Sequence, residues 1–354
     1  MTRGLLDLLE IDAPIIQAPM AGVSTPEMAA AVSNAGALGS ISVGATDVRG
    51  AQKMIAAFRE RSRRSLNVNV FCHAPARADH AREAKWLDRL RPEFERLGAR
   101  PPAELHEIYR SFVEDDAMLE LLVAERPKVV SFHFGVPAPA RVHALRDAGV
   151  VLLGAATSLA EARALAAADV DVIVSQGFEA GGHRGTFDPD AADDALSTFA
   201  LTRLLARELD RPVVAAGGIM DGAGIAAALR LGASAAQLGT AFVACDESAI
   251  DVGYRAALAS DAAHHTLMTR AISGRPARCL ANRFTAIGAD VAARELPDYP
   301  IAYDAGKALH AAGKAAGNFG FGAQWAGQGA PLSKRMPAAD LVALLRRELS
   351  DVAR

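Results

Sequence analysis

The feature that most constrains the fold is a repeated alternation of short, continuous apolar runs with longer stretches of helical pattern. Because the runs are continuously apolar, they are typical of parallel strands that are buried on both faces. Eight such strands with helices between them predict an α/β fold in which the sheet closes into a (β/α)8 TIM barrel. The eight predicted strands are residues 14–18, 38–42, 66–71, 129–134, 150–154, 172–175, 213–216 and 235–239.

Local signals mark the helices between these strands. Thr25-Pro26 places a capping hydroxyl directly before a proline, which is typical of a helix start. Ser158 precedes Glu161 in a capping box, and Asp221 is expected to cap the helix after the seventh strand. Glycines are predicted to end helices at positions 36, 149 and 232.

Two segments are too long to be a single helical connection between consecutive strands, and they predict an added substructure. Residues 72–127 are charged and helical in pattern, and we interpret them as an enlarged third crossover. Residues 244–320 separate the eighth strand from the last helix, which is expected near residues 338–349. We therefore predict a barrel made of residues 1–243 and 321–354, and a mainly helical lid domain made of residues 244–320.

The composition argues against several classes of partner. The 354 residues carry a formal net charge of −3 without a long basic run, so nucleic acid is not expected to bind. No charge-free apolar stretch reaches about 18 residues, and the acidic N-terminal segment does not resemble a signal peptide. The three cysteines, Cys72, Cys245 and Cys279, form no CxxC motif and no metal site is expected. We expect buried free thiols and a cytoplasmic location, the alternative being one nucleophilic cysteine.

Two glycine motifs lie where a barrel of this kind often holds a phosphate. Gly217-Gly218-Ile219 follows the seventh strand, and Gln237-Leu238-Gly239-Thr240 ends the eighth. Glycine lets the backbone approach an anion closely, and free amide groups can point at it. The motifs predict a phosphate site, although ordinary turns are the alternative.

The loop after the sixth strand is the most unusual segment. Residues 175–185 place four glycines around His183, and the loop also contains Gln176 and Gly181. Such a backbone can lie against a planar ligand and present an imidazole to it. Histidine is suited to acid–base chemistry near neutral pH. We expect His183 to be catalytic, the alternative being a structural histidine in a surface loop.

Further strand ends supply candidate ligand contacts. Met20 and Ala21 follow the first strand and leave room for a flat ring, and Asn69 in the third strand offers an amide. His133, near the end of the fourth strand, is expected to face the same opening. Ordinary strand-end packing is the alternative for each. The glycine-rich, aromatic residues 318–329 are expected either to close over a cofactor or to pack back on the barrel.

The four tyrosines and one lysine predict a cradle for a small anion. Pro300 is suited to the start of a helix, which would place Tyr303 and Lys307 one turn apart on one face, with Tyr299 just before it. Tyr109 and Tyr254 are included as weaker candidates, because nothing local places them at the opening. The alternative is that the tyrosines pack with their hydroxyl groups in water.

The motifs together resemble the nitronate monooxygenase family, class I, formerly called 2-nitropropane dioxygenases. The resemblance rests on residues 14–22 (PIIQAPMAG), 179–185 (EAGGHRG), 216–219 (AGGI), 237–240 (QLGT) and 324–328 (QWAGQ), which span nearly the whole chain. It implies a barrel with an added domain that binds FMN noncovalently. By matching motif, it implies FMN contacts at Met20, Ala21, Asn69, Gln176, Gly181, Gly217, Gly218, Gln237, Leu238, Gly239 and Thr240.

The resemblance also implies a reaction. Alkyl nitronates, notably the dianion propionate 3-nitronate, would be oxidised by O2 to an oxo compound and nitrite through a flavin semiquinone. His183 would be the catalytic residue. The cradle already inferred from the residues would then hold this dianion, with His133, Tyr109, Tyr254, Tyr299, Tyr303 and Lys307 as candidate substrate contacts. The protein would act as a monomer or homodimer. Two alternatives are an FMN-dependent NAD(P)H:quinone or enoyl reductase on the same barrel, and a noncatalytic barrel that binds a phosphate ligand.

Overall fold

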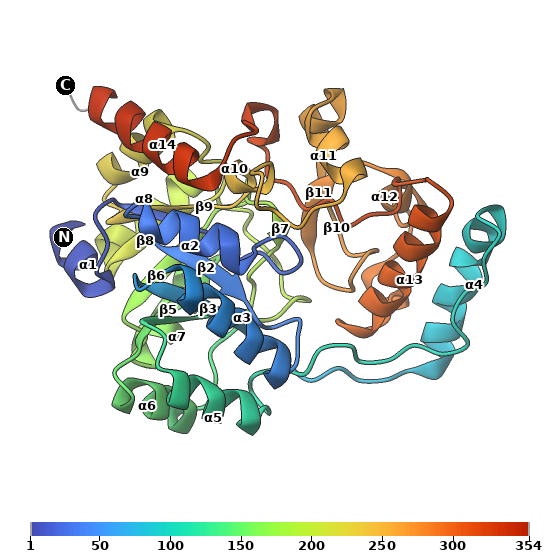
Figure 1. The fold of residues 1–354 in the computed structure, drawn as a ribbon. Helices are drawn as coiled ribbons and strands as arrows, with labels where there is room; N and C mark the ends of the chain where they lie inside the picture. The colour runs from blue at the N-terminus through green and yellow to red at the C-terminus, as the bar shows by residue number, and fades with distance from the viewer. Residues whose placement is uncertain (1, 353–354) are drawn as a thin grey trace.

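The computed structural model describes residues 2–352, and a sheet of eight parallel strands lies at its centre (Figure 1). The strands run in the order β1-β9-β8-β6-β5-β4-β3-β2, and a parallel bridge between Ile16 and Leu38 joins the two ends of the sheet. The predicted barrel is therefore confirmed, and each predicted run overlaps one strand. These are β1 (Ile15–Gln17), β2 (Gly39–Ser42), β3 (Leu66–Phe71), β4 (Val129–His133), β5 (Val151–Ala156), β6 (Val172–Gln176), β8 (Val213–Ala216) and β9 (Ala235–Leu238).

Eight helices cover the outside of the barrel. The expected caps are present: Thr25 accepts a hydrogen bond from the Met28 N–H, and Ser158 accepts one from the Glu161 N–H. Apolar side chains fill the layer between these helices and the strands. The helices are α2 (Pro26–Asn34), α3 (Val48–Arg61), α5 (Asp116–Glu125), α6 (Pro139–Asp147), α7 (Leu159–Ala167), α8 (Thr198–Glu208), α9 (Gly222–Arg230) and α14 (Ala338–Val352).

A separate cluster of small aliphatic side chains fills the barrel interior. Strand residues such as Val129, Leu153 and Val214 meet there and are fully buried. Leu5 and Leu9, from the N-terminal helix α1 (Thr2–Leu9), belong to the same cluster and are also fully buried. The interior is thus closed at the α1 side, and a ligand site must lie at the carboxyl ends of the strands.

The added substructure contains, beside its helices, a second sheet that the sequence did not predict. The antiparallel strands β10 (Thr266–Thr269) and β11 (Ala277–Leu280) pair with the two-residue strand β7 (Gly182–His183), which comes from the loop after β6. Its helices and 3-10 turns are α11 (Val252–Leu258), η1 (Asp261–His264), α12 (Arg283–Ile287), η2 (Ala293–Glu295) and α13 (Ile301–Ala315). Two short turns flank it in sequence, α10 (Thr240–Val243), which packs on the barrel, and η3 (Ala330–Leu332).

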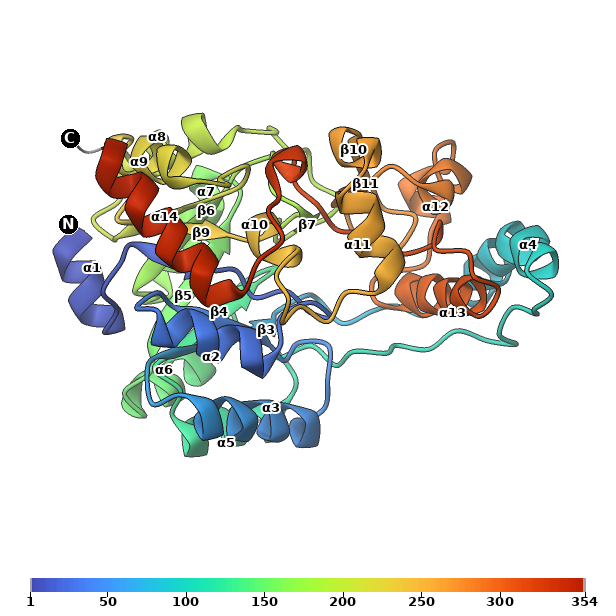
Figure 2. The same ribbon diagram turned by 45° about the horizontal axis from the view of Figure 1, so that its top comes forward.

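The enlarged third crossover contributes to this substructure rather than to the barrel wall. Its helix α4 (His80–Arg96) lies beside α13, far from the sheet, as Figures 1 and 2 both show. Trp86, Leu90 and Phe94 of α4 are buried in one cluster with Leu309 of α13 and Phe284 of α12. The packed unit therefore combines two stretches of chain that lie almost 200 residues apart, roughly the distance between Leu90 and Phe284 in sequence.

Candidate functional site

A cavity of about 330 Å³ lies between the carboxyl ends of the barrel strands and the added substructure. Its volume is within the range of ligand pockets. It brings together sixteen of the residues that the sequence singled out, from the barrel, the third crossover, the β6–β7 loop, and α13 with the residues just before it. These are Met20, Ala21, Asn69, Tyr109, His133, Gln176, Gly181, His183, Gly217, Gly218, Gln237, Gly239, Thr240, Tyr299, Tyr303 and Lys307.

Two of the proposed residues do not line the cavity. Leu238 is fully buried and packs in the layer between the sheet and the helices. Tyr254 is buried in α11, and its hydroxyl donates to the backbone carbonyl of Trp325. The side chain of Tyr254 therefore supports the segment that carries Trp325 and does not reach the cavity, which corrects its assignment to the substrate cradle.

Backbone amide groups are available at the glycine motifs. Gly217 and Gly218 have φ angles of 124° and 68°, a region in which glycine is favoured. Within residues 2–352, no protein acceptor is bonded to the N–H groups of Gly218 and Ile219, and both residues line the cavity. Free amide groups at a strand end are suited to an anion. This wall of the cavity, Gly217 to Ile219, is called the glycine wall below.

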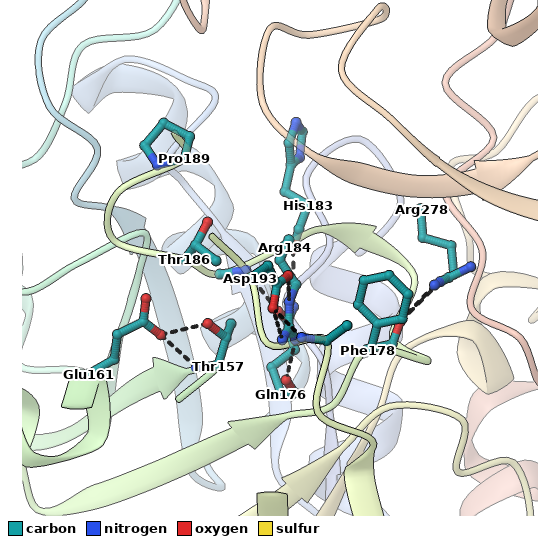
Figure 3. A network of polar contacts seen from close by, with 12 residues as sticks. Thr157, Glu161, Gln176, Phe178, His183, Arg184, Thr186, Pro189, Asp193 and Arg278 are labelled. Carbon is teal, nitrogen blue, oxygen red and sulfur yellow. Dashed lines mark hydrogen bonds and ion pairs between the residues drawn. The ribbon is translucent and has the colours of Figure 1, made fainter. Parts of the chain in front are cut away.

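A polar network fixes the β6–β7 loop. The amide of Gln176 donates to the His183 carbonyl at 3.0 Å and accepts from the Gly185 N–H at 2.7 Å. Buried Arg184 forms a two-pronged ion pair with Asp193, at 2.8 and 3.0 Å. Figure 3 shows that the His183 side chain extends to the opposite side of the loop from Arg184. The network therefore holds the backbone while the imidazole remains directed to the cavity.

Glycine is required where this loop meets the segment around Trp325. A Cβ atom at Gly181 would lie 2.4 Å from the Gly327 backbone nitrogen, and Gln328 N–H donates to the Glu179 carbonyl at 2.9 Å. Residues 325–329 therefore pack closely against the loop. Trp325 itself lines the cavity, with its ring centroid 5.0 Å from that of His183.

The histidines of the site are held neutral. Burial lowers the pKa of His183 well below its ordinary value, and the nearby charges of His133 and Arg275 lower it further. Burial likewise lowers the pKa of His133 to about 4, despite a hydrogen bond with the His183 carbonyl that opposes the shift. A neutral imidazole has one donor and one acceptor nitrogen, so His183 can accept a proton or donate a hydrogen bond.

The side chains of the predicted anion cradle lie together at the α13 side of the cavity. Tyr303 and Lys307 are one turn apart, and the Lys307 ammonium lies 5.5 Å from the Tyr303 ring and 4.7 Å from the Tyr109 ring. Burial raises the pKa of Tyr303 to about 12 and that of Tyr299 well above its ordinary value, so both phenols stay protonated. The Tyr299 hydroxyl is buried and has no hydrogen-bond partner within residues 2–352.

The amide side chains of the cavity are used in different ways. Asn69 is engaged by the protein, because its amide donates to Ser131 and its carbonyl oxygen accepts from Ser42 at 3.1 Å. Gln176 holds the loop, as described above. Gln237 lines the cavity, and its side chain, unlike its strand-paired backbone, forms no hydrogen bond within residues 2–352. Gln237 is thus the side-chain amide that remains available to a ligand.

Sequence reasoning missed Phe134 as a cavity residue. It follows β4 in the left-handed region, with a φ of 73°, which is unusual for a bulky side chain. Its ring lies 5.6 Å from that of His183 and 5.5 Å from that of Tyr299, and the Arg275 guanidinium lies 4.3 Å from its centroid. Phe134 is the last residue of the predicted strand 129–134, and that position alone does not single out a cavity residue.

Other groups in the described part of the chain carry no further reactive site. The three cysteines are buried and free, as expected, and burial raises the pKa of Cys245 and of Cys279 to about 12. Residues 2–352 contain no cluster of three or more His, Cys, Asp or Glu side chains that is suited to a metal ion. None of the helices in this range is both long and apolar enough to span a membrane.

Known proteins resemble this chain along nearly its whole length. The model of the family described as nitronate monooxygenase matches residues 3–348. A nitronate monooxygenase of Paraburkholderia phytofirmans is 62% identical over 347 residues, covering 98% of this chain and 95% of the relative. One of Pseudomonas aeruginosa is 52% identical, covering 99% of each chain.

A solved structure agrees with the sequence relatives. The nitroalkane oxidase from Streptomyces ansochromogenes superposes with a TM-score of 0.89 at 39% identity, and the match covers 99% of each chain. Fold, family model and full-length relatives point to the same enzymes. The chain belongs to the nitronate monooxygenase family of oxidoreductases.

Proposed function

We propose that this protein is an FMN-dependent enzyme that oxidises alkyl nitronates with O2 to an oxo compound and nitrite. One observation carries the proposal beyond the family assignment. A single cavity combines the glycine wall, with its free N–H groups, and a wall on which the unpartnered Tyr299 hydroxyl lies near neutral His183. The first wall is suited to a phosphate, and the second to a small anion.

The residues present fit FMN. The N–H groups of Gly218 and Ile219 would bind its phosphate, together with Gly239 and Thr240 at the end of β9. Gln237 would donate or accept at the edge of the flavin ring, which needs both kinds of group. Bound FMN would supply an acceptor for electrons from the nitronate and a route for those electrons to O2.

The α13 side of the cavity would bind the substrate. Propionate 3-nitronate carries two negative groups, a nitronate and a carboxylate. The Tyr299 and Tyr303 hydroxyls remain protonated and would donate hydrogen bonds to one of them, while Lys307 would attract the other. The Lys307 side chain lies at the exposed edge of the cavity, which favours the outer, carboxylate end as its partner.

His183 would have a role that depends on the substrate. A nitronate has already lost its α-proton, so it needs no base. Toward a nitronate the neutral imidazole would donate a hydrogen bond, and toward a neutral nitroalkane it would accept the α-proton. The low pKa of His183 keeps the imidazole in the neutral form that both roles require.

The direct test is to mix the purified holoenzyme anaerobically with propionate 3-nitronate and follow the flavin spectrum. We expect the oxidised flavin absorbance to fall, and to return with release of nitrite when O2 is admitted. Tyr299→Phe should respond only at higher nitronate concentration. Rapid bleaching by NADH but not by the nitronate would favour the reductase alternative. A colourless protein that takes up no FMN would favour the noncatalytic barrel.

A further inference from the structure

We infer that Ser273 is a positioning residue that selects the tautomer of His183, and thereby decides whether this histidine accepts a proton or donates one. The inference rests on the proposed function, because it concerns the two roles that nitroalkanes and nitronates would require. Ser273 lies in the turn between β10 and β11, in the added substructure, whereas His183 comes from the loop after β6.

The contact between the two residues is short and buried. The Ser273 hydroxyl lies 2.8 Å from Nε2 of His183, and Ser273 is fully buried. Nδ1 of His183 forms no hydrogen bond within residues 2–352, and His183 lines the cavity. We therefore take Nδ1 as the ring nitrogen that is available to a ligand. The direction of the hydrogen bond between Ser273 and Nε2 therefore decides whether Nδ1 presents a hydrogen or a lone pair to the substrate.

The turn that carries Ser273 has little freedom to move. Gly274 has a φ of 91°, and a Cβ atom there would lie 2.7 Å from the Pro297 carbonyl oxygen and 2.8 Å from the Tyr299 nitrogen. Its N–H donates to the Arg270 carbonyl at 2.7 Å. Beyond the turn, Ala277 of β11 is paired with His183 itself. Backbone contacts thus hold Ser273, His183 and Tyr299 in one rigid arrangement.

The groups around the imidazole favour its neutral form from every side. Burial lowers its pKa most, and the charges of His133 on β4, Arg275 in the Ser273 turn and His73 lower it further. The rings of Tyr299, just before α13, and Tyr303, on α13, pack against the imidazole without adding a charge. Within residues 2–352, no carboxylate contacts the ring to stabilise an imidazolium. A neutral imidazole carries one hydrogen, so its placement on Nε2 or Nδ1 is the property that remains to be set.

The Ser273 hydroxyl has two acceptors for its single hydrogen. When it donates to the Arg275 carbonyl, at 3.3 Å, its oxygen accepts from Nε2–H, and Nδ1 presents a lone pair to the cavity. When it donates to Nε2 instead, Nδ1 carries the hydrogen and donates to the cavity. The two orientations of the hydroxyl thus match the two neutral tautomers, which carry the same charge. The tautomers interconvert when the ring releases its hydrogen at one nitrogen and takes one up from solvent at the other.

Each form matches one substrate class. With the lone pair on Nδ1, the imidazole takes the α-proton of a nitroalkane, the C–H electron pair becomes the C=N bond, and the nitro oxygens take the negative charge. With the hydrogen on Nδ1, the imidazole donates to an oxygen of a nitronate. An anion in the cavity should therefore draw the hydrogen to Nδ1.

The test measures the tautomer directly, by NMR of histidine side-chain nitrogens in the isotope-labelled holoenzyme. His183→Asn identifies the signals of His183, and succinate serves as an unreactive dianion in place of propionate 3-nitronate. In the wild type, succinate should increase the fraction of His183 that carries hydrogen on Nδ1. Ser273→Ala should abolish this response, and Ser273→Thr, which keeps the hydroxyl, should restore it.

Two further variants keep the result interpretable. Ser234→Ala removes a buried hydroxyl without a hydrogen-bond partner, outside the cavity lining, and should respond as the wild type does. If Ser273→Ala does not fold, Ser273→Cys takes its place in the test. The thiol is similar in size to the hydroxyl but forms only weak hydrogen bonds, so this variant should also lose the response to succinate. Ser273→Ala should also lower kcat/KM for nitroethane roughly tenfold, the effect of about 1.4 kcal/mol.

Either of two results would overturn the inference: an unchanged wild-type tautomer with succinate, or an equal shift in wild type and Ser273→Ala. These results are independent of turnover. The proposed function fails separately, if the wild-type holoenzyme does not oxidise propionate 3-nitronate.

Discussion

Burial sets the chemistry of individual residues around the cavity. His73, His133 and His183 all have a lowered pKa, chiefly because each ring is removed from water, and the positive charge of Arg275 lowers each pKa further. A cavity lined by neutral imidazoles and protonated phenols can donate hydrogen bonds to an anion without becoming charged itself. What these side chains can do for a ligand therefore depends on which nitrogen or oxygen carries a hydrogen, because none of the imidazoles or phenols is charged.

Replacement of His183 should separate the two substrate classes. His183→Asn removes the group that accepts a proton, and a general base typically contributes about 100-fold or more to the rate. We expect kcat/KM for nitroethane to fall at least about 100-fold, and that for propionate 3-nitronate to fall less than about tenfold. Steady-state oxygen consumption with both substrates measures this. Equal losses on the two substrates would mean that His183 is not a base.

His73 should make stability depend on pH. Its folded pKa is about 4, against an ordinary value of 6.5, so the unfolded chain binds more protons between these values. The contribution of His73 to stability is complete above pH 6.5 and is lost as the pH falls toward 4. Both its ring nitrogens lack partners within residues 2–352, so His73→Phe should fold.

The expected change is in the slope of the unfolding free energy against pH. One proton corresponds to about 1.4 kcal/mol per pH unit. Denaturant unfolding between pH 4 and 6.5 should therefore show a slope that is smaller in His73→Phe by up to this amount. Parallel curves for the variant and the wild type would contradict the assignment.

How far single residues could be predicted depends on whether their neighbours are near in sequence. Tyr303 and Lys307 were predicted together, since a helix places residues one turn apart on one face. Tyr109 joins them through the tertiary fold, because Lys307 lies over its ring. Ser273 and Phe134 carried no signal, because a turn in the hairpin and a left-handed φ position them.

At the scale of elements, the glycine wall depends on a backbone that other residues adopt only with strain. Gly218→Val places a branched side chain at a φ of 68°, with its Cβ 3.3 Å from Glu179. We expect the purified protein to contain much less FMN, and to need a higher FMN concentration to recover it. Absorbance and a fluorescence titration with FMN measure this.

Gly98→Val is the matched control. Gly98 ends α4 with a φ of 69°, is far from the cavity lining, and has open space around it. Both variants should lose about 1–2 kcal/mol of stability, the cost of a left-handed conformation. Only Gly218→Val should lose flavin. Full flavin content with reduced turnover in Gly218→Val would place the phosphate elsewhere.

The strands differ in how clearly the sequence pattern predicts them. Each barrel strand is a continuous apolar run, because both of its faces are covered, and all eight were predicted. The second sheet was not predicted: β7 has only two residues, and β10 and β11 are four-residue strands of mixed polarity. Such strands owe their existence to pairing with one another rather than to their own propensity.

At the scale of the whole molecule, the α13 side of the cavity, where we propose that the substrate binds, depends on a core outside the barrel. Leu90→Ala in α4 removes a fully buried side chain from the cluster that supports α13. We expect a loss of about 2–5 kcal/mol in stability. KM for propionate 3-nitronate should rise because Tyr303 and Lys307 lie on α13, whereas flavin content should remain unchanged.

Leu122→Ala makes the same substitution in the layer between the barrel strands and helices, where Leu122 of α5 is also fully buried. Its loss of stability should be similar, with little change in KM. Urea denaturation and nitronate saturation curves compare the two variants. If both raise KM equally, α4 has no specific part in holding the α13 side of the cavity.

The pairing of β7 with β11 has a consequence for how such a chain can diversify. The strand that carries His183 belongs to the barrel loop by sequence and to the second sheet by hydrogen bonding. Residues 244–320 are therefore not an exchangeable module. A chimera that takes this stretch from a distant relative should lose the alignment of His183 with Ser273, unless it also inherits the β6–β7 loop and α4. The three stretches that encode α4, the β6–β7 loop and residues 244–320 must therefore come from the same parent, although they are separated in the gene.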